Sequence, residues 1–418
     1  MKRGEIIAVG SELLIGGRVE TNSLFLSDRL GTLGIEPRFK SVVGDSEDDI
    51  VAVLRTAARR ADIVILTGGL GPTSDDRTRH AVARAVGRPL RRRAEALAGM
   101  SARLTAWGRI PTAAQLKQTL IPSGADVLAN PVGSAPGFAL RWNGAFIAAL
   151  PGVPGEAAAM FDVAVLPHLA GQGGREGTRI ERRLLHTFGL LESDIDRQLR
   201  EVMIRHSSIQ LGLLASPLGV TISLTTRGVP ARGAGLDRLV QAVKRRLHRH
   251  LYAQDEETME VVVGRELATH GLTLAIAESC TGGLIGHRLT QVPGSSDYFD
   301  RGAITYSNQA KHEVLGVPLA LLRRHGAVSA QVAAAMAKGV RVTSRTDIGL
   351  SVTGIAGPGG GTATKPVGLV YIGLNAKAPR GSSQRSVTAE FRFHGDRHTI
   401  KMRASQAALN MVRLWLAD

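Results

Sequence analysis

Cysteine is almost absent from the 418-residue sequence, and it contains no long apolar run. The single cysteine, Cys280, excludes a disulfide framework and any zinc or iron–sulfur site built from several thiolates. No apolar run approaches the roughly 20 residues that a membrane-spanning helix needs. The first residues also lack the long apolar region of a signal peptide. We therefore expect a soluble, cytoplasmic protein without a membrane partner.

Aromatic residues and lysine are scarce as well, although the chain is strongly basic. Lysine and arginine number 52 against 36 acidic residues, a formal net charge of +16, and only nine of the 52 are lysine. Such a charge is compatible with nucleic acid binding. However, aromatics make up 4% of the chain, and the basic runs 91–93 and 244–246 contain none that could stack on bases. We expect solvated basic helix faces and anionic small substrates, and no nucleic acid partner.

The length and the order of apolar runs predict an α/β protein of two or three domains. In the first third, short apolar runs alternate with helical patterns, which is typical of βαβ units and a parallel sheet. A glycine-rich stretch at 171–177 is interpreted as a linker, and a small α+β module follows it. The expected domains are therefore residues 1–171, 172–253 and 254–418.

A candidate phosphate site lies where strands of the first domain end. Glycine-rich loops follow the predicted strands 62–66 and 145–150, so they should share the carboxyl edge of one sheet, where such sheets bind ligands. Glycines let backbone N–H groups approach phosphate oxygens. The glycines of the first loop are Gly68, Gly69 and Gly71, and polar residues at the same edge are Glu12, Asn22 and Glu156.

Two adjacent carboxylates, Asp75 and Asp76, follow this glycine loop. They suit a divalent cation that bridges to bound phosphates. The alternative is an ordinary strand-to-helix turn in which one aspartate caps the helix.

A second candidate site lies in the third domain, where Ser279 sits at a strand-to-helix turn and Lys311 follows Tyr306. A serine becomes a nucleophile when a base takes its proton, and a buried lysine with a lowered pKa can be that base. The alternative is a surface lysine and a serine that caps a helix. Cys280 is the rival nucleophile, but it has no recognisable histidine partner, so we favour Ser279.

Over essentially its whole length the sequence resembles the CinA family (competence/damage-inducible protein A). The stretches that carry this resemblance are 67–76, 130–137, 150–156, 188–193, 277–283, 306–311, 353–360, 365–368 and 393–397. The resemblance implies a doubly wound molybdopterin-binding-like first domain, a KH-like connector and a nicotinamide-nucleotide amidohydrolase domain. RNA-binding KH modules use a GXXG loop, and none is evident in the connector.

For the third domain the resemblance implies hydrolysis of nicotinamide mononucleotide to nicotinic acid mononucleotide and ammonia, without a cofactor. The family's serine, tyrosine and lysine fall on Ser279, Tyr306 and Lys311. Its substrate-binding residues fall on Thr353, Gly354 and Arg397. The resemblance also suggests a homodimer.

For the first domain it implies a metal-dependent ADP-ribose pyrophosphatase, with Asp75 and Asp76 as metal ligands and ADP-ribose as substrate. Residues expected to bind that substrate are Gly68, Gly69, Gly71, Glu12 and Asn22. Ser11 stands where the family commonly has aspartate, which lowers the affinity expected for a divalent ion. The alternative is an accessory protein that binds a pterin or a nucleotide without pyrophosphatase turnover.

Overall fold

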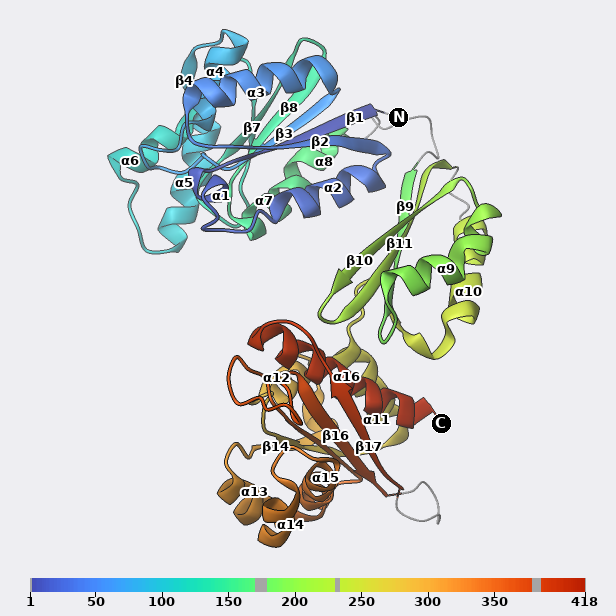
Figure 1. Cartoon of the computed structure of the whole chain (residues 1–418). Coiled ribbons are helices and arrows are strands. Elements are labelled where there is room, and N and C mark those ends of the chain that lie inside the picture. The colour runs from blue at the N-terminus through green and yellow to red at the C-terminus, as the bar shows by residue number, and fades with distance from the viewer. Residues whose placement is uncertain (1, 170–178, 230–233, 378–384, 418) are drawn as a thin grey trace. The chain divides into compact units, whose positions relative to one another are not determined.

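The computed structural model describes residues 2–169, 179–229, 234–377 and 385–417 (Figure 1). The chain divides into two compact units, Met1–Glu181 with Thr225–Ala234, and Arg182–Leu224 with Gly235–Asp418. The linker expected at 171–177 lies outside the described residues.

The first unit is built on a six-stranded sheet of order β2-β1-β3-β8-β7-β6. Strands β2, β1, β3 and β8 pair with one another in parallel. Strand β7 pairs with β8 in antiparallel direction, and β6 pairs with β7 in the same way. The strands are β1 (Lys2–Val9), β2 (Ile35–Val43), β3 (Ile63–Thr67), β4 (Leu90–Arg92), β5 (Leu120–Pro122), β6 (Asp126–Leu128), β7 (Gly137–Trp142) and β8 (Ala145–Leu150). The helices are α1 (Ser11–Leu14), α2 (Asn22–Thr32), α3 (Glu47–Arg60), α4 (Thr78–Val86), α5 (Ala94–Ala106), α6 (Ala113–Leu116), η1 (Lys117–Thr119), α7 (Pro154–Met160), η2 (Phe161–Val165) and α8 (Leu166–Leu169).

Helices cover both faces of this sheet, as the doubly wound prediction requires. One apolar cluster joins α3 and α4 to the sheet, and another joins α2 and α7 to its other face. Strand β3 is buried along its whole length, which explains its continuous run of apolar, mostly β-branched residues. Helix α3 begins at Ser46, whose side chain accepts a hydrogen bond from the Asp49 N–H, and its charges follow the helix dipole.

The second unit begins with the KH-like α+β module, in which helices α9 and α10 pack on a sheet of order β10-β11-β9-β12. Its elements are β9 (Arg179–Thr187), α9 (Glu192–Ile204), β10 (Ile209–Ser216), β11 (Gly219–Val229), α10 (Ala234–Leu247), η3 (His248–His250) and β12 (Leu251–Gln254).

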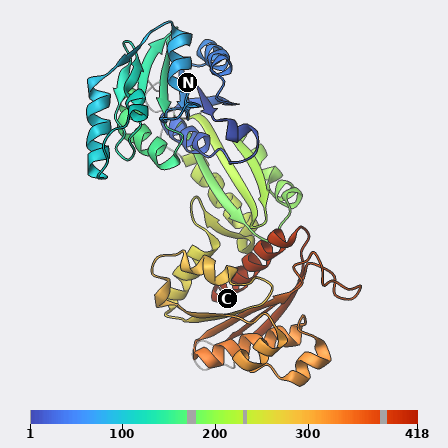
Figure 2. The ribbon, with the colours of Figure 1, turned by 90° about the vertical axis from the view of Figure 1, so that its left-hand side faces the viewer.

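The rest of the second unit is a three-layer α/β/α structure around a sheet of order β14-β13-β15-β16-β17. Its strands are β13 (Leu274–Glu278), β14 (Phe299–Ile304), β15 (Ile348–Gly354), β16 (Leu369–Ala376) and β17 (Arg385–Arg392). Its helices are α11 (Met259–His270), α12 (Leu284–Thr290), η4 (Ser295–Asp297), α13 (Asn308–Leu315), α14 (Leu319–His325), α15 (Ala330–Ser344) and α16 (Arg397–Ala417). Figure 2 shows α13–α15, in orange, on one side of this sheet and the red α16 on the other.

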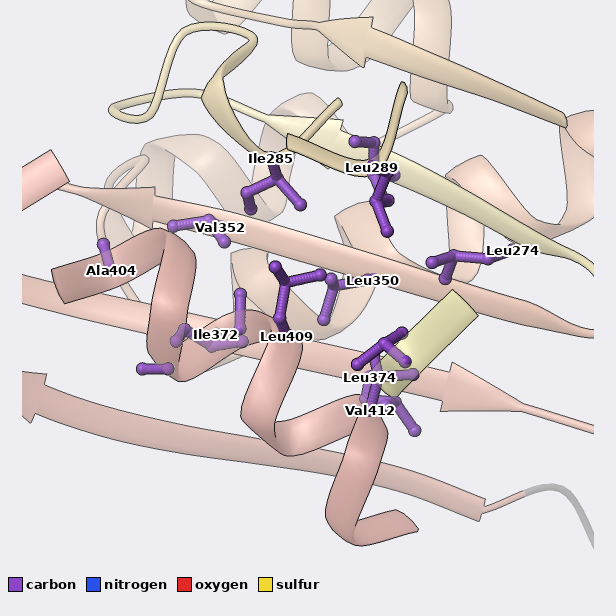
Figure 3. Packing of buried hydrophobic residues seen from close by; sticks show 14 of the residues in the cluster. Leu274, Ile285, Leu289, Leu350, Val352, Ile372, Leu374, Ala404, Leu409 and Val412 are labelled. Carbon is purple, nitrogen blue, oxygen red and sulfur yellow. The ribbon is translucent and has the colours of Figure 1, made fainter. Parts of the chain in front are cut away.

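The face under α16 holds the larger apolar core. Leu409 and Val412 of α16 pack with Leu350, Ile372 and other sheet residues, as Figure 3 shows. Because this packing fixes α16 against the sheet, it also fixes the polar residues at the start of the helix.

On the opposite face, α15 approaches the sheet closely at two glycines. A Cβ atom added to Gly349 would lie 2.1 Å from the Ala337 carbonyl oxygen, and one added to Gly373 would lie 2.6 Å from the Ala333 carbonyl oxygen. The atoms in the way belong to the backbone, which cannot rotate away as a flexible side chain could. The sheet and α15 therefore require glycine at these positions.

We predict that Gly349→Ala destabilises the second unit by about 1–3 kcal/mol, because the new methyl group forces helix and sheet apart. Urea unfolding of the full chain measures this effect. Gly359→Ala is the matched control, since a Cβ there meets nothing within 4 Å. Equal stability of the two variants would show that α15 can move away without cost.

Candidate active site

Ser279 and Lys311 meet at the carboxyl edge of the five-stranded sheet. Ser279 follows β13, and its N–H donates to the Val352 carbonyl of neighbouring β15 at 3.0 Å. Lys311 lies in the first turn of α13, and its Nζ is 3.0 Å from Ser279 Oγ. The side chains are nearly inaccessible, at 8% exposure for Ser279 and 1% for Lys311. The structure therefore brings together the two side chains that the sequence suggested as candidate nucleophile and base.

Among the described residues, no carboxylate is hydrogen-bonded to Lys311. Besides Ser279 Oγ, its Nζ contacts the carbonyl oxygens of Thr305 at 2.8 Å and Tyr306 at 3.2 Å. Burial lowers the pKa of Lys311 from 10.5 to about 8, and the Cys280 thiol opposes this shift only in part. About a tenth of the lysine is then neutral at pH 7, far more than for an exposed lysine.

The buried Glu278 organises the turn that carries Ser279. Its carboxylate accepts hydrogen bonds from the backbone N–H groups of Gly283, Ile285 and Gly286. The N-terminus of α12 is thus occupied by the protein's own carboxylate and is not free for a ligand. Within the described part of the chain, the N–H groups of Cys280 and Thr281 in this turn donate to no other residue, although the Cys280 N–H interacts with its own thiol.

Cys280 is poorly suited to act as the nucleophile. It is buried, and burial raises the pKa of its thiol to about 12, although the nearby Lys311 and Lys401 act in the opposite direction. Because the thiolate is the reactive form, this side chain is inert near neutral pH. The structure therefore agrees with the preference for Ser279.

The side chains of Tyr306 and Arg397 are hydrogen-bonded to each other and not to the side chains of Ser279 and Lys311. Arg397 donates from one terminal nitrogen to the Tyr306 hydroxyl at 3.0 Å and from the other to the Gly357 carbonyl at 2.7 Å. The Tyr306 side chain is 60% exposed, and its backbone carbonyl, not its phenol, contacts Lys311. Arg397 thus links the 354–361 loop to the segment before α13.

Thr353 and Gly354, expected to bind substrate, lie at the end of β15, close to this edge. The buried Thr353 hydroxyl donates to the Ala327 carbonyl at 2.9 Å. A Cβ on Gly354 would lie 2.7 Å from the Leu369 carbonyl oxygen. Packing within the protein accounts for both residues.

At the carboxyl edge of the first unit there is a cavity of about 170 Å³, lined in part by Glu12 and Asn22. Asn22 is mostly buried, and its amide donates to Thr67 Oγ1 at 2.7 Å and to the Gly152 carbonyl at 2.9 Å. It therefore ties the end of β3 to the loop after β8. Glu156 lies in the first turn of α7, which follows this loop, and its carboxylate accepts a hydrogen bond from the Asn130 amide at 2.7 Å.

The three glycines of the first loop permit a tight backbone fold. Gly68 and Gly69 have φ values of 105° and 66°, and a Cβ on either would lie about 2 Å from Val9 O or Thr78 Oγ1. A Cβ on Gly71 would lie 2.4 Å from the carboxylate of Asp76. Packing of the loop on itself thus explains these glycines, and they do not line the cavity.

Asp76 is the carboxylate that holds this loop. One of its oxygens accepts from the Gly71 N–H at 2.7 Å, and the other accepts from the N–H and hydroxyl of Thr73 at 2.8 and 2.5 Å. Asp75 is exposed to solvent. The described residues contain no group of three or more histidine, cysteine or acidic side chains that could hold a metal. This donor set does not fit a divalent ion at Asp75 and Asp76.

Sequence reasoning missed two cations that the structure places at these loops. Arg79, 2% exposed, donates to the carbonyls of Leu70 and Gly71, and burial lowers its pKa to about 10. Lys401 lies beside Gly282, in the turn after Ser279. Its spacing of four residues from Arg397 on one helix was the signal that could have revealed it.

The chain matches three family models in succession. Residues 5–171 match "Probable molybdopterin binding domain", residues 182–253 match "Damage-inducible protein CinA KH domain", and residues 256–416 match "CinA C-terminal domain". A protein of Caldicellulosiruptor bescii named as competence-damage inducible is 42% identical over 416 residues, 99% of each chain. One of Moorella thermoacetica with the same name is 43% identical, over 99% of this chain and 98% of its own. This chain belongs to the CinA family.

Among solved structures, a competence/damage inducible protein from Agrobacterium tumefaciens is 41% identical, with a TM-score of 0.35, over 39% of this chain and 98% of its own. In this CinA-family chain, the segment matched by the C-terminal model contains Ser279, Lys311 and Arg397. No helix in the described residues has the length and apolar character needed to cross a membrane.

We predict that Asp76→Ala destabilises the first unit by about 1–3 kcal/mol, because the Gly71 and Thr73 donors lose a charged acceptor. Asp75→Ala, the adjacent control, should leave stability nearly unchanged. Urea unfolding with and without a chelator measures both. A wild-type stability that drops in chelator, with Asp75→Ala as damaging as Asp76→Ala, would establish a metal site instead.

Proposed function

We propose that the C-terminal α/β domain hydrolyses the carboxamide of nicotinamide mononucleotide, giving nicotinic acid mononucleotide and ammonia. The observation that carries this proposal is the buried contact between Lys311 Nζ and Ser279 Oγ, together with the lowered pKa of the lysine. A serine beside a largely buried amine without a carboxylate partner is an arrangement for nucleophilic catalysis. The family resemblance supplies the substrate.

The three contacts of Lys311 fit the neutral amine that a base requires. A neutral amine has two N–H bonds and one lone pair. The carbonyls of Thr305 and Tyr306 can accept both N–H bonds, which leaves the lone pair for the proton of Ser279. The carbonyls therefore orient the amine as well as anchor it.

The reaction then proceeds in two stages. Ser279 Oγ bonds to the carboxamide carbon while its proton passes to Lys311, and a tetrahedral intermediate forms. Collapse of the intermediate breaks the carbon–nitrogen bond, and the proton on Lys311 passes to the departing nitrogen, which leaves as ammonia. Water, deprotonated by the same amine, attacks the acyl ester, and Ser279 takes a proton back as nicotinic acid mononucleotide leaves.

The turn after Ser279 offers donors for the negative oxygen of the intermediate. The N–H groups of Cys280 and Thr281 are candidates, because the N–H groups that follow are already engaged. The Gly282 N–H donates to the Ser279 carbonyl, and later N–H groups donate to Glu278. Backbone donors fixed in a buried turn need no reorganisation during the reaction. Glu278 supports them by holding the turn in place.

The first unit carries no comparable proposal for turnover. Because the donor set at Asp75 and Asp76 does not fit a divalent ion, we derive no pyrophosphatase step through one. The cavity beside Glu12 and Asn22 favours the alternative for this unit, binding of a pterin or a nucleotide. Ser11 is part of the local fold there, since its hydroxyl accepts from the Asp45 N–H and its N–H donates to the Asp45 carboxylate.

We predict that kcat/KM for ammonia release rises about tenfold per pH unit below pH 8 and levels off above it. Lys311 is active when neutral, and its lowered pKa places the change near 8. Initial rates between pH 7 and 9.5 measure the profile, above most of the titration of the substrate phosphate, whose second pKa is about 6. A rate that is flat or falls with rising pH would exclude lysine as the base.

We further predict that Ser279→Ala and Lys311→Arg each reduce kcat by at least a thousandfold, since either change disables the pair. Arginine keeps the charge but does not release its proton near neutral pH. Cys280→Ser is the adjacent control and should have a mild effect. Ammonia release by folded variants measures this, and an inactive Cys280→Ser beside an active Ser279→Ala would assign the nucleophile to the cysteine.

A further inference from the structure

Two cations on α16, Arg397 and Lys401, are one helical turn apart, and they differ in their contacts. Both terminal nitrogens of Arg397 already donate to the protein, at Tyr306 and Gly357. A phosphate held by both nitrogens would have to displace both contacts. Lys401 has no hydrogen bond or ion pair with any described residue. It is therefore the cation available to a ligand.

Lys401 lies against the turn that carries the nucleophile. A Cβ built on Gly282 would be 3.6 Å from Lys401 Nζ. The Gly282 N–H donates to the Ser279 carbonyl at 3.2 Å, so Gly282 and Ser279 are the two ends of one turn. Lys401 also interacts electrostatically with Cys280, the residue next to Ser279.

In the part of the chain that the structure describes, no carboxylate forms an ion pair with Lys401. The carboxylate in this turn belongs to Glu278, which is buried and accepts three backbone N–H groups of the α12 N-terminus. The other cations near the turn are Lys311 and, at the start of the same helix, Arg397. A half-buried ammonium without a partner carries a desolvation cost that a bound anion would offset.

We propose that Lys401 binds the phosphate of the nucleotide substrate, whereas Arg397 is a positioning residue that holds Tyr306 and the 354–361 loop. This rests on the proposed function, because it takes Ser279 as the group that meets the carboxamide. A nicotinamide nucleotide carries its carboxamide at one end and its phosphate at the other. With Ser279 at one end of the turn and Lys401 beside Gly282 at its other end, the site would select the phosphorylated molecule over the nucleoside.

Calorimetric titration of full-length Ser279→Ala protein tests this proposal, because that protein binds without turnover. We expect Lys401→Gln in this background to weaken nicotinamide mononucleotide about ten- to a hundredfold, the effect of losing one charged hydrogen bond. Nicotinamide riboside, which lacks the phosphate, should bind both proteins equally. Lys401→Arg should retain most of the affinity, and Lys338→Gln, on the exposed side of α15, is the matched control.

Equal weakening of nucleotide and nucleoside by Lys401→Gln would assign Lys401 to the support of the turn and overturn the proposal. The proposal for Lys401 is also overturned if the Lys401→Gln enzyme, with Ser279 intact, releases ammonia with an unchanged preference for the nucleotide. In that case the proposed amidohydrolase activity is still supported. A third outcome separates the two proposals. If the wild-type chain binds ribose 5-phosphate but releases no ammonia, and Lys401→Gln abolishes that binding, the phosphate site is supported and the amidohydrolase is refuted.

Discussion

An amine is rarely buried without an acid beside it, and Lys311 is held against Ser279 by carbonyl groups alone. Desolvation disfavours its charge, so the pKa of this lysine falls to about 8. Burial of the Lys311 amine therefore reduces the stability of the folded state, and packing elsewhere must offset this loss. The same burial produces a neutral base beside a hydroxyl, and the proposed chemistry depends on that base.

The surrounding architecture keeps this pair buried and aligned. Parallel pairing of β13 with β14 and β15 puts Ser279 and the Thr305 carbonyl at one sheet edge, and the Glu278 carboxylate fixes the turn between β13 and α12. Apolar packing of α16 holds Arg397 and Lys401 at the same edge. Each of these contacts is local, but together they determine which groups a substrate meets.

The alternation of apolar runs predicted the sheets. Spacing alone left Ser279 and Lys311 open as a helix cap and a surface lysine, and the family resemblance singled them out. The sequence could not predict how Asp76, Thr353 and Arg397 use their polar atoms. Each is satisfied by a backbone or side-chain group that is distant in the sequence or created by the loop itself. Lys401 was missed as well: its four-residue spacing from Arg397 could be read from the sequence, but its position beside the turn after Ser279 could not.

The central claim is that the pKa of Lys311 lies near 8, so that an appreciable fraction of the amine is neutral near physiological pH, and its titration can be observed directly. With only nine lysines in the chain, labelled side-chain amines can be followed individually by NMR as the pH is raised. We expect one lysine to titrate near pH 8, and its signal to be missing from Lys311→Met protein. If all nine lysines titrate near their ordinary pKa of about 10.4, Lys311 is charged in the native protein and the account is wrong.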